Sequence, residues 1–284
     1  MARTDECMAC GIRTNPVSQM NTGALIFAFD NQKTDYVAMA VWSAQNIRRH
    51  LNIPTSIVTD RAIDHAVFDQ VIVTTAKSGG SRYFEDYAAN VTWHNAGRVD
   101  AYDLTPYNQT LVLDADYVVA SDQLKFVLNS TQNFLCHKDA YTLAGGTALD
   151  SLNKFGNYDM PMWWATVMMF RKSNQAQYIF DCMHMIRENW QHYRDVYQIN
   201  NKTYRNDFAL SIALGIVNGH TLTVDEIPWP LMSSMPDHNL TKLSQDSFRL
   251  QYKCNQGKPH EIMFTGMDFH AMGKKNLGEI VAAD

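Results

Sequence analysis

A short apolar run that ends in two carboxylates is the feature that most constrains the fold of this chain. Leu111, Val112 and Leu113 are followed by Asp114 and Asp116, which form the only D-x-D pattern in the sequence. Such a run is typical of a strand buried on both faces. Carboxylates two residues apart on a strand point to one side and can share a hard divalent cation such as Mg²⁺ or Mn²⁺. The simpler alternative is a turn aspartate followed by a solvated one.

The composition is that of a globular enzyme, with 284 residues, 46% apolar and 19% charged. A net charge of −5 argues against a protein that simply coats nucleic acid. No apolar run approaches the roughly 20 residues of a membrane span, and the N-terminus lacks a signal-peptide core. We therefore expect no membrane span and a cytoplasmic location.

The N-terminus carries a C-x-x-C pattern, Cys7 and Cys10, among five cysteines in all. An odd number of cysteines in a long chain fits reduced thiols better than a disulfide framework. A zinc site needs about four ligands, and no second pair follows at the usual spacing. We expect residues 1–22 to be a flexible arm without chemistry.

The following residues predict a β-α-β unit, which implies parallel strands and an α/β fold. An apolar strand over residues 24–29 precedes a helix over 37–51, which Asp35 or Thr34 can cap, and a second strand over 56–59. A third strand is expected over 71–74. The unit has no G-x-G-x-x-G dinucleotide fingerprint. The loop at Phe29 and Asp30 still suits a nucleotide, and Asp60 can accept hydrogen bonds from a base or ribose, or be a turn aspartate.

The second half alternates predicted helices, loops and one aromatic strand. Trp163 and Trp164 open that strand and could stack on a sugar ring, although tryptophan also fills cores. Asp207 opens a later helix, where an N-cap role would explain it. The expected elements are a Gly/Ser-rich loop over 77–82, a short helix over 123–128, a flexible loop over 137–160, the strand over 162–170, one long helix from 173 to 197, a helix over 208–217 and a proline-punctuated loop over 228–241.

Basic residues flank the D-x-D strand in sequence and reappear near the C-terminus. Arg98 precedes that strand and suits a diphosphate next to a metal, although an exposed helical arginine would be unremarkable. His270, Gly273, Lys274 and Lys275 combine a metal ligand, close backbone approach and phosphate neutralisation. A lone histidine is more often structural.

Taken in order, these motifs resemble those of GT-A-fold glycosyltransferases, and most of all the retaining family that includes glycogenin and bacterial galactosyltransferases. The resemblance covers residues 23 to about 276. It implies an α/β fold of GT-A (Rossmann-like) type, with a mixed, mostly parallel central sheet flanked by helices. It further implies a single catalytic domain over 23–284, with a nucleotide-binding half over 23–120 and an acceptor half over 121–284.

The same resemblance implies transfer of a sugar from a nucleoside-diphosphate sugar, with UDP as the nucleotide, to a hydroxyl acceptor with retention. Mn²⁺ (or Mg²⁺) would be held by Asp114, Asp116 and His270. Asn206 and Asp207 fall near the reacting sugar, where the family carries Asp-Gln, and the family's terminal Pro-Trp is missing. Trp163 and Trp164 would bind the acceptor. The implied donor-binding residues are Ala28, Phe29, Asp30, Tyr36, Asp60, Arg98, Ala115, Gly273, Lys274 and Lys275.

The chain also resembles glycosyltransferase-like proteins of tailed phages, which implies a hydroxymethylated DNA base as acceptor and the host cytoplasm as location. Two alternatives remain. Asp114 to Val118 matches the D-x-D-x-[TV] motif of haloacid-dehalogenase-type phosphatases, in which the first aspartate is a nucleophile, but a complete β-α-β unit precedes it here. A catalytically inactive nucleotide-sugar-binding protein is the non-enzyme alternative. A nucleotidyltransferase would need a Gly-rich basic loop after the first strand, which is absent.

Overall fold

The computed structural model describes residues 20–149, 152–221, 224–254 and 256–284. Cys7, Cys10 and most of the predicted N-terminal arm lie outside these residues. The arm was predicted to reach residue 22, and this boundary is wrong because the first strand, β1, begins at Met20. In the described part of the chain, no helix is both long and apolar enough to cross a bilayer.

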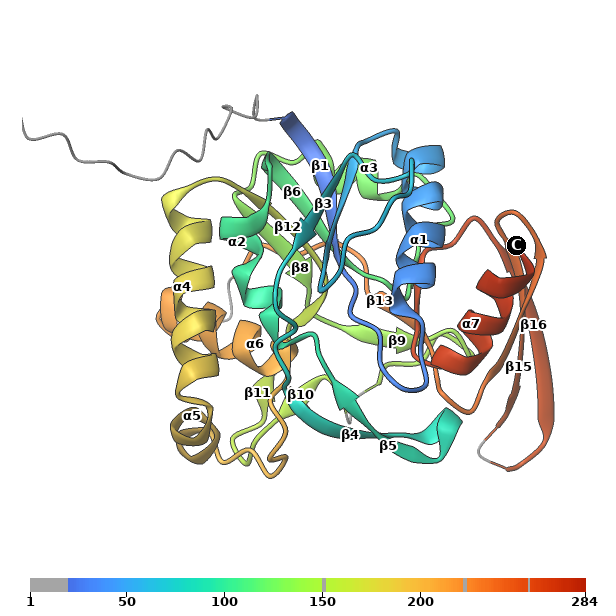
Figure 1. Ribbon diagram of the computed structural model, residues 1–284. Coiled ribbons are helices and arrows are strands. Elements are labelled where there is room, and N and C mark those ends of the chain that lie inside the picture. Colours follow the sequence, from blue (N-terminus) through green and yellow to red (C-terminus); the bar gives the residue numbers. More distant parts are fainter. Residues whose placement is uncertain (1–19, 150–151, 222–223, 255) are drawn as a thin grey trace, which may run out of the picture.

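A six-stranded sheet forms the centre of the molecule (Figure 1). Its strand order is β3-β2-β1-β6-β12-β8. β3, β2, β1 and β6 are parallel, and β12 runs antiparallel to both β6 and β8. The strands are β1 (Met20–Phe27), β2 (Thr55–Thr59), β3 (Gln70–Val73), β6 (Tyr107–Asp114), β8 (Phe134–His137) and β12 (Trp164–Arg171). The prediction of a mixed, mostly parallel α/β sheet is confirmed.

The D-x-D strand occupies an interior position because its side chains are apolar on both faces. Leu111, Val112 and Leu113 have no exposed surface. β6 pairs with β1 on one side, with Phe27 opposite Asp114, and with β12 on the other. Asp114 is therefore the last residue of a central strand, at the carboxyl edge of the sheet.

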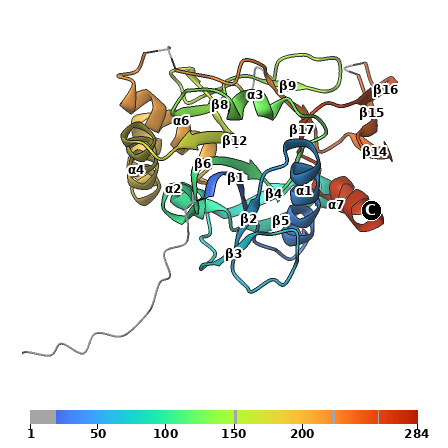
Figure 2. The same ribbon diagram turned by 90° about the horizontal axis from the view of Figure 1, so that it is seen from above.

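Helices cover both faces of this sheet (Figures 1 and 2). α1 lies on one face and begins at the predicted cap, since the Asp35 carboxylate accepts a hydrogen bond from the Ala38 N–H at 2.8 Å. α2 and α4 lie on the other face, with α6 against β12. The helices are α1 (Tyr36–Leu51), α2 (Ala101–Leu104), α3 (Leu124–Leu128), α4 (Asn174–Glu188), α5 (Trp190–Val196), α6 (Asn206–Val217) and α7 (Lys274–Ala283).

The single helix predicted from residue 173 to 197 is wrong, because the chain breaks at Asn189 into α4 and α5. Asn189 has φ −111°, and its side-chain amide donates to the Met185 carbonyl at 2.9 Å, which caps the end of α4. Asparagine bonds readily to nearby backbone and so favours helix ends over helix interiors.

A second, four-stranded sheet has the order β7-β17-β13-β9. Its strands are β7 (Tyr117–Val118), β9 (Ala140–Thr142), β13 (Leu231–Ser234) and β17 (Phe269–Ala271). The loop predicted over 228–241 is wrong at its centre, since Leu231 to Ser234 pair with β9 and β17 once Pro230 has been passed. The loop predicted over 137–160 likewise contains β9 and β10 (Lys154–Phe155), which pairs with β11 (Met160–Pro161).

Two peripheral units complete the described fold. A hairpin of β4 (Gly80–Phe84) and β5 (Ala89–Trp93) replaces the end of the loop predicted over 77–82, with short 3₁₀ turns at Glu85–Tyr87 (η1) and Ala96–Asp100 (η2). In Figure 1 it crosses below the carboxyl ends of β1 and β6. β14 (Asn239–Ser244), β15 (Ser247–Lys253) and β16 (Pro259–Thr265) form an antiparallel sheet beside α7.

Candidate functional site

A cavity of about 340 Å³ opens at the carboxyl edge of the central sheet. Phe27 and Asp114 line it from the ends of β1 and β6. β12 is antiparallel to β6, so its first residue, Trp164, reaches the same edge. The hairpin β4–β5, the start of α6 and β17 supply the remaining walls. Ligands bind at this edge in open α/β sheets.

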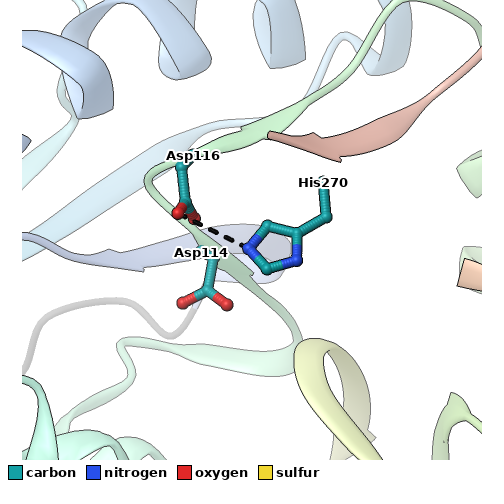
Figure 3. Close-up of side chains that lie close together, drawn as sticks. All are labelled: Asp114, Asp116 and His270. Carbon is teal, nitrogen blue, oxygen red and sulfur yellow. Dashed lines mark ion pairs between the residues drawn. The ribbon is translucent and has the colours of Figure 1, made fainter. Parts of the chain in front are cut away.

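The three residues predicted to bind a metal ion lie close together in this cavity (Figure 3). Asp114 ends β6, Asp116 lies in the turn that follows, and His270 is on β17. β17 pairs with β7 so that His270 stands opposite Tyr117, and the Ala271 N–H donates to the Asp116 carbonyl at 2.9 Å. One ligand atom from each of the three side chains lies within 4.8 Å of the other two.

This cluster fits a divalent cation. Two carboxylates and one imidazole offer oxygen and nitrogen donors of the kind that Mn²⁺ accepts. In the described structure these donors already contact cationic side chains. Asp116 forms an ion pair with Lys274 and lies 3.5 Å from His270 Nε2, while Asp114 forms an ion pair with Arg98. A metal ion bound here would coordinate Asp114 and Asp116 in place of their present contacts with Arg98 and Lys274.

The charge of Asp116 is maintained by its neighbours. Burial alone would raise the pKa of its carboxyl, but the Lys274 ammonium and the His270 ring outweigh burial and hold that pKa well below its usual value. Asp116 is therefore an anion at neutral pH, as a metal ligand must be.

Arg98 is only 2% exposed and is held on two sides. Its guanidinium pairs with Asp114, and its Nη1 donates to the Ala165 carbonyl at 2.6 Å. Burial lowers the pKa of Arg98 to about 10, which leaves it charged at neutral pH. The alternative of an unremarkable exposed arginine is wrong.

Asp207 faces the cavity from the first turn of α6. Its Oδ1 accepts from the Ala165 N–H at 3.0 Å, and its Oδ2 pairs with Arg205 Nη2 at 2.8 Å. Burial raises the pKa of this carboxyl, but Arg205 and the Ala165 N–H outweigh burial, so the pKa lies below its usual value. The helix N-cap is Arg205, so an N-cap role does not explain Asp207.

An irregularity in β12 explains why the backbone of one residue, Ala165, holds both Arg98 and Asp207. The pairing of β12 with β8 shifts register between Trp164 and Met168. Within this irregular stretch, the N–H of Ala165 donates to Asp207, and the carbonyl of Ala165 accepts from Arg98. Bulges of this kind are frequent next to active sites, where they redirect side chains.

Several buried polar atoms around the cavity have no hydrogen-bond partner. Buried polar groups in native proteins are almost always paired, so this concentration indicates a polar ligand. Nitrogens with protons to donate and carbonyl oxygens that accept are both present, as a hydroxyl-rich molecule requires. The atoms are Arg82 Nε, Asn95 Oδ1, Arg98 Nε, Trp164 Nε1, Arg205 Nε, Asn206 Oδ1 and His270 Nδ1.

The structure brings most of the predicted site residues to this cavity. In addition to the cluster, its lining includes Phe29, Tyr36, Arg98, Ala115, Trp164, Asn206, Asp207 and Lys274.

Six predicted site residues do not line the cavity. Ala28 and Trp163 are buried in the core, and Asp60 is exposed. Asp30 bonds to the Val37 N–H and to Arg61. Gly273 precedes α7, and Lys275 is exposed.

Sequence reasoning missed several side chains in the cavity wall, among them Arg82, Trp93 and Arg205. Arg82 lay in a segment interpreted as a loop. Trp93 reaches Arg82 only because β4 pairs with β5. Arg205 directly precedes Asn206 and Asp207, so its position next to two candidate residues was the available signal.

Comparisons with known proteins place the chain near glycosyltransferases of solved structure. No protein-family model and no curated protein matches it. GlyE of Streptococcus pneumoniae TIGR4 is 11% identical with a TM-score of 0.41, over 73% of this chain and 45% of that chain. The galactosyltransferase LgtC, in complex with donor and acceptor sugar analogues, is 14% identical with a TM-score of 0.44, over 66% and 69%.

Mouse xyloside xylosyltransferase 1 is 11% identical with a TM-score of 0.43, over 71% of this chain and 83% of that chain. The chain thus spans less than half the length of GlyE. At identities of 11–14% and TM-scores of 0.41–0.44, these likenesses are too distant to assign an activity.

Proposed function

We propose that this protein is a metal-dependent, GT-A-type glycosyltransferase that moves a sugar from a nucleoside-diphosphate sugar to a hydroxyl acceptor with retention. The carrying observation is the cluster of Asp114, Asp116 and His270, which lies at the carboxyl edge of the sheet in a cavity lined by unpartnered polar atoms. The nucleotide is UDP in this proposal. Residues 23–120 form the nucleotide-binding half, and residues 121–284 form the acceptor half.

Mn²⁺ (or Mg²⁺) is the proposed cofactor, held by Asp114, Asp116 and His270. When bound, it neutralises the negative charge that develops on the departing diphosphate. Arg98 and Lys274, which contact the two carboxylates here, would be available to the diphosphate oxygens when the cation is bound by those carboxylates. Both side chains are shielded from water, which strengthens their attraction for developing charge.

The other predicted residues of the cavity receive the two ends of the donor. Phe29, Tyr36 and Ala115 contact the nucleoside side, near the end of β1 and the D-x-D turn. Asn206 and Asp207 face the transferred sugar. As the bond to phosphate breaks, positive charge grows on the anomeric carbon, and the Asp207 carboxylate stabilises it. The Asn206 Oδ1, which has no hydrogen-bond partner among the described residues, accepts a hydrogen bond from a sugar hydroxyl. Trp164 contacts the acceptor.

The experiment is a thermal-shift screen of nucleoside-diphosphate sugars with Mn²⁺, followed by measurement of nucleoside diphosphate release from the best donor. We expect Mn²⁺-dependent stabilisation and slow release in the absence of acceptor, because water substitutes poorly for the acceptor hydroxyl. Asp116→Asn should abolish both. Asp195→Asn is the matched control, since Asp195 is an exposed carboxylate on α5.

The alternatives give different results in the same assay. Release of inorganic phosphate from simple phosphomonoesters would indicate a phosphatase. Binding of a sugar nucleotide without any turnover would indicate a binding protein. Absence of both Mn²⁺-dependent binding and release would refute the proposed function.

A further inference from the structure

One guanidinium in the cavity wall has no ion-paired carboxylate in the part of the chain that the structure describes. Arg82, on β4, stacks on Trp93 of β5 with its Cζ 3.7 Å from the ring centroid. Its Nη2 donates to the Tyr204 carbonyl at 3.0 Å. Its Nε is shielded from solvent and has no acceptor, although the side chain lines the cavity. Stacking and the carbonyl hold the group in place, but neither brings a negative charge into contact with it.

The other cationic groups of the inner cavity are already matched. Arg98 pairs with Asp114, Lys274 with Asp116, and Arg205 with Asp207. Among the described residues, no carboxylate lies within 4.0 Å of the Arg82 guanidinium. Burial, followed by the nearby Arg205, lowers the pKa of Arg82 to about 9, so it is still charged at neutral pH. Asp207 attracts this cation only from beyond ion-pair distance, and a shielded cation without an anion in contact is unfavourable unless a ligand supplies one.

The position of Arg82 indicates which part of a donor would supply that anion. Its hydrogen bond to Tyr204 joins it to the segment that leads directly into Arg205, Asn206 and Asp207, the proposed sugar side. Thr203 Oγ1 also donates to the Ser81 carbonyl at 3.5 Å. The diphosphate side already has Arg98 and Lys274. The N-terminus of α6 has no side-chain cap and adds positive potential on the same wall.

We infer that Arg82 makes this site selective for a donor whose transferred sugar carries a carboxylate, as a uronic acid does. The Nε proton would bond to one carboxylate oxygen, and the guanidinium charge would be neutralised in a shielded site, where charge-assisted hydrogen bonds are strong. This inference rests on the proposed function, because it assumes that the cavity binds a nucleoside-diphosphate sugar.

The test compares matched donors that differ only at the sugar C6 group. Binding of UDP-glucuronate and UDP-glucose, and of GDP-mannuronate and GDP-mannose, is measured by calorimetry with Mn²⁺, beside UDP and GDP alone. We expect the acidic member of a pair to bind about ten- to a hundredfold more tightly, as one charge-assisted hydrogen bond implies. Arg82→Gln should remove this preference and leave nucleoside diphosphate affinity unchanged, whereas Arg82→Lys should retain part of the preference.

Arg48→Gln is the control for a lost positive charge, since Arg48 is an exposed residue in the last turn of α1. Equal binding of acidic and neutral sugars by the wild type would overturn the inference and leave the proposed function intact. The inference would also be overturned if Arg82→Gln weakened the binding of UDP, or weakened the binding of the acidic and the neutral sugar nucleotide equally. Arg82 would then serve the diphosphate or the fold of the hairpin. If no nucleotide binds at all, the proposed function itself fails.

Discussion

At the scale of single residues, acidic and basic side chains in this cavity compensate one another's charge in pairs. Three carboxylates face three cations, and each carboxylate is partly or fully buried. Such pairs cost free energy when one member is removed, because the remaining charge is left in a poorly solvated place. They also keep Asp116 and Asp207 ionised, as the lowered pKa values of these two carboxyls indicate. Function at this scale depends on charge more than on shape.

Asp207→Asn tests that statement directly. An asparagine Oδ1 can still accept from the Ala165 N–H, but the negative charge that we propose to stabilise the reacting sugar is lost. We expect donor turnover to fall by about 10²- to 10³-fold, the typical effect of losing one preorganised group. Affinity for nucleoside diphosphate with Mn²⁺ should change less than turnover, as measured by calorimetry. Asp122→Asn, at an exposed carboxylate, is the control. An equal loss in nucleotide affinity would contradict a role for Asp207 at the sugar.

At the scale of elements, the site depends on how α6 is fixed to β12. The Ser211 hydroxyl, buried on α6, accepts from the Trp163 N–H at 2.7 Å and donates to the Asp207 carbonyl at 2.7 Å. One side chain thus joins the helix that carries Asn206 and Asp207 to the strand that carries Trp164 and Ala165. Trp163 directly precedes β12, so this bond fixes α6 at the point where the strand begins.

Ser211→Ala should therefore affect stability and turnover together. Loss of the hydroxyl leaves a buried N–H unpaired, which is expected to lower the free energy of unfolding by about 1–3 kcal/mol. Turnover should fall even where the variant is fully folded, because the start of α6 then keeps only the bond from the Ala165 N–H to Asp207 and loses the bridge through Ser211. Urea denaturation and donor release measure the two effects.

Ser173→Ala is the matched serine control. Ser173 caps α4 by accepting from the Ala176 N–H at 3.3 Å, so its loss should cost about 1 kcal/mol without changing turnover. Equal losses of turnover in both variants would show that turnover follows global stability and not the position of α6.

At the scale of the whole molecule, the two sheets meet at the D-x-D turn. β6 of the central sheet leads through this turn into β7, which pairs with β17 of the second sheet. β8 and β9 make a second connection, and His137 at the end of β8 is fully buried there. Its Nδ1 hydrogen-bonds to the Trp229 carbonyl at 2.9 Å, just before β13.

His137 should make the stability of the molecule depend on pH. Burial lowers the pKa of its imidazole from 6.5 to about 4. Between these values the unfolded chain binds a proton that the folded chain excludes, so stability rises with pH and is lost as pH falls through this window. The full effect is about 3 kcal/mol.

His137→Asn can keep the donor to Trp229 but does not titrate, so its stability should depend less steeply on pH across this window. Asp268, whose pKa burial raises to about 6, acts in the opposite sense in both proteins and cancels from the comparison. Urea denaturation at several pH values gives the two curves. Parallel curves would contradict a neutral, buried His137.

Local pattern alone predicted the central sheet well. The apolar run before Asp114 indicated an interior strand, and the β-α-β unit after residue 23 indicated parallel pairing, because burial on both faces and helical periodicity are local properties. It failed at Asn189 and at Leu231 to Ser234, where a side-chain cap and pairing with distant strands decide the structure. Asn189 is itself a local signal for a helix end, whereas no local pattern indicated the strand over 231–234.

The sequence by itself determined that two carboxylates stand at the tip of a buried strand, since residue spacing and strand geometry suffice for that. Only the tertiary structure decided what surrounds them. The pairing of His270 with Tyr117, the burial of Arg98 against Ala165 and the stacking of Arg82 on Trp93 join segments far apart in the chain. Such contacts arise from the packing of whole elements, which leaves no pattern in any one stretch of sequence.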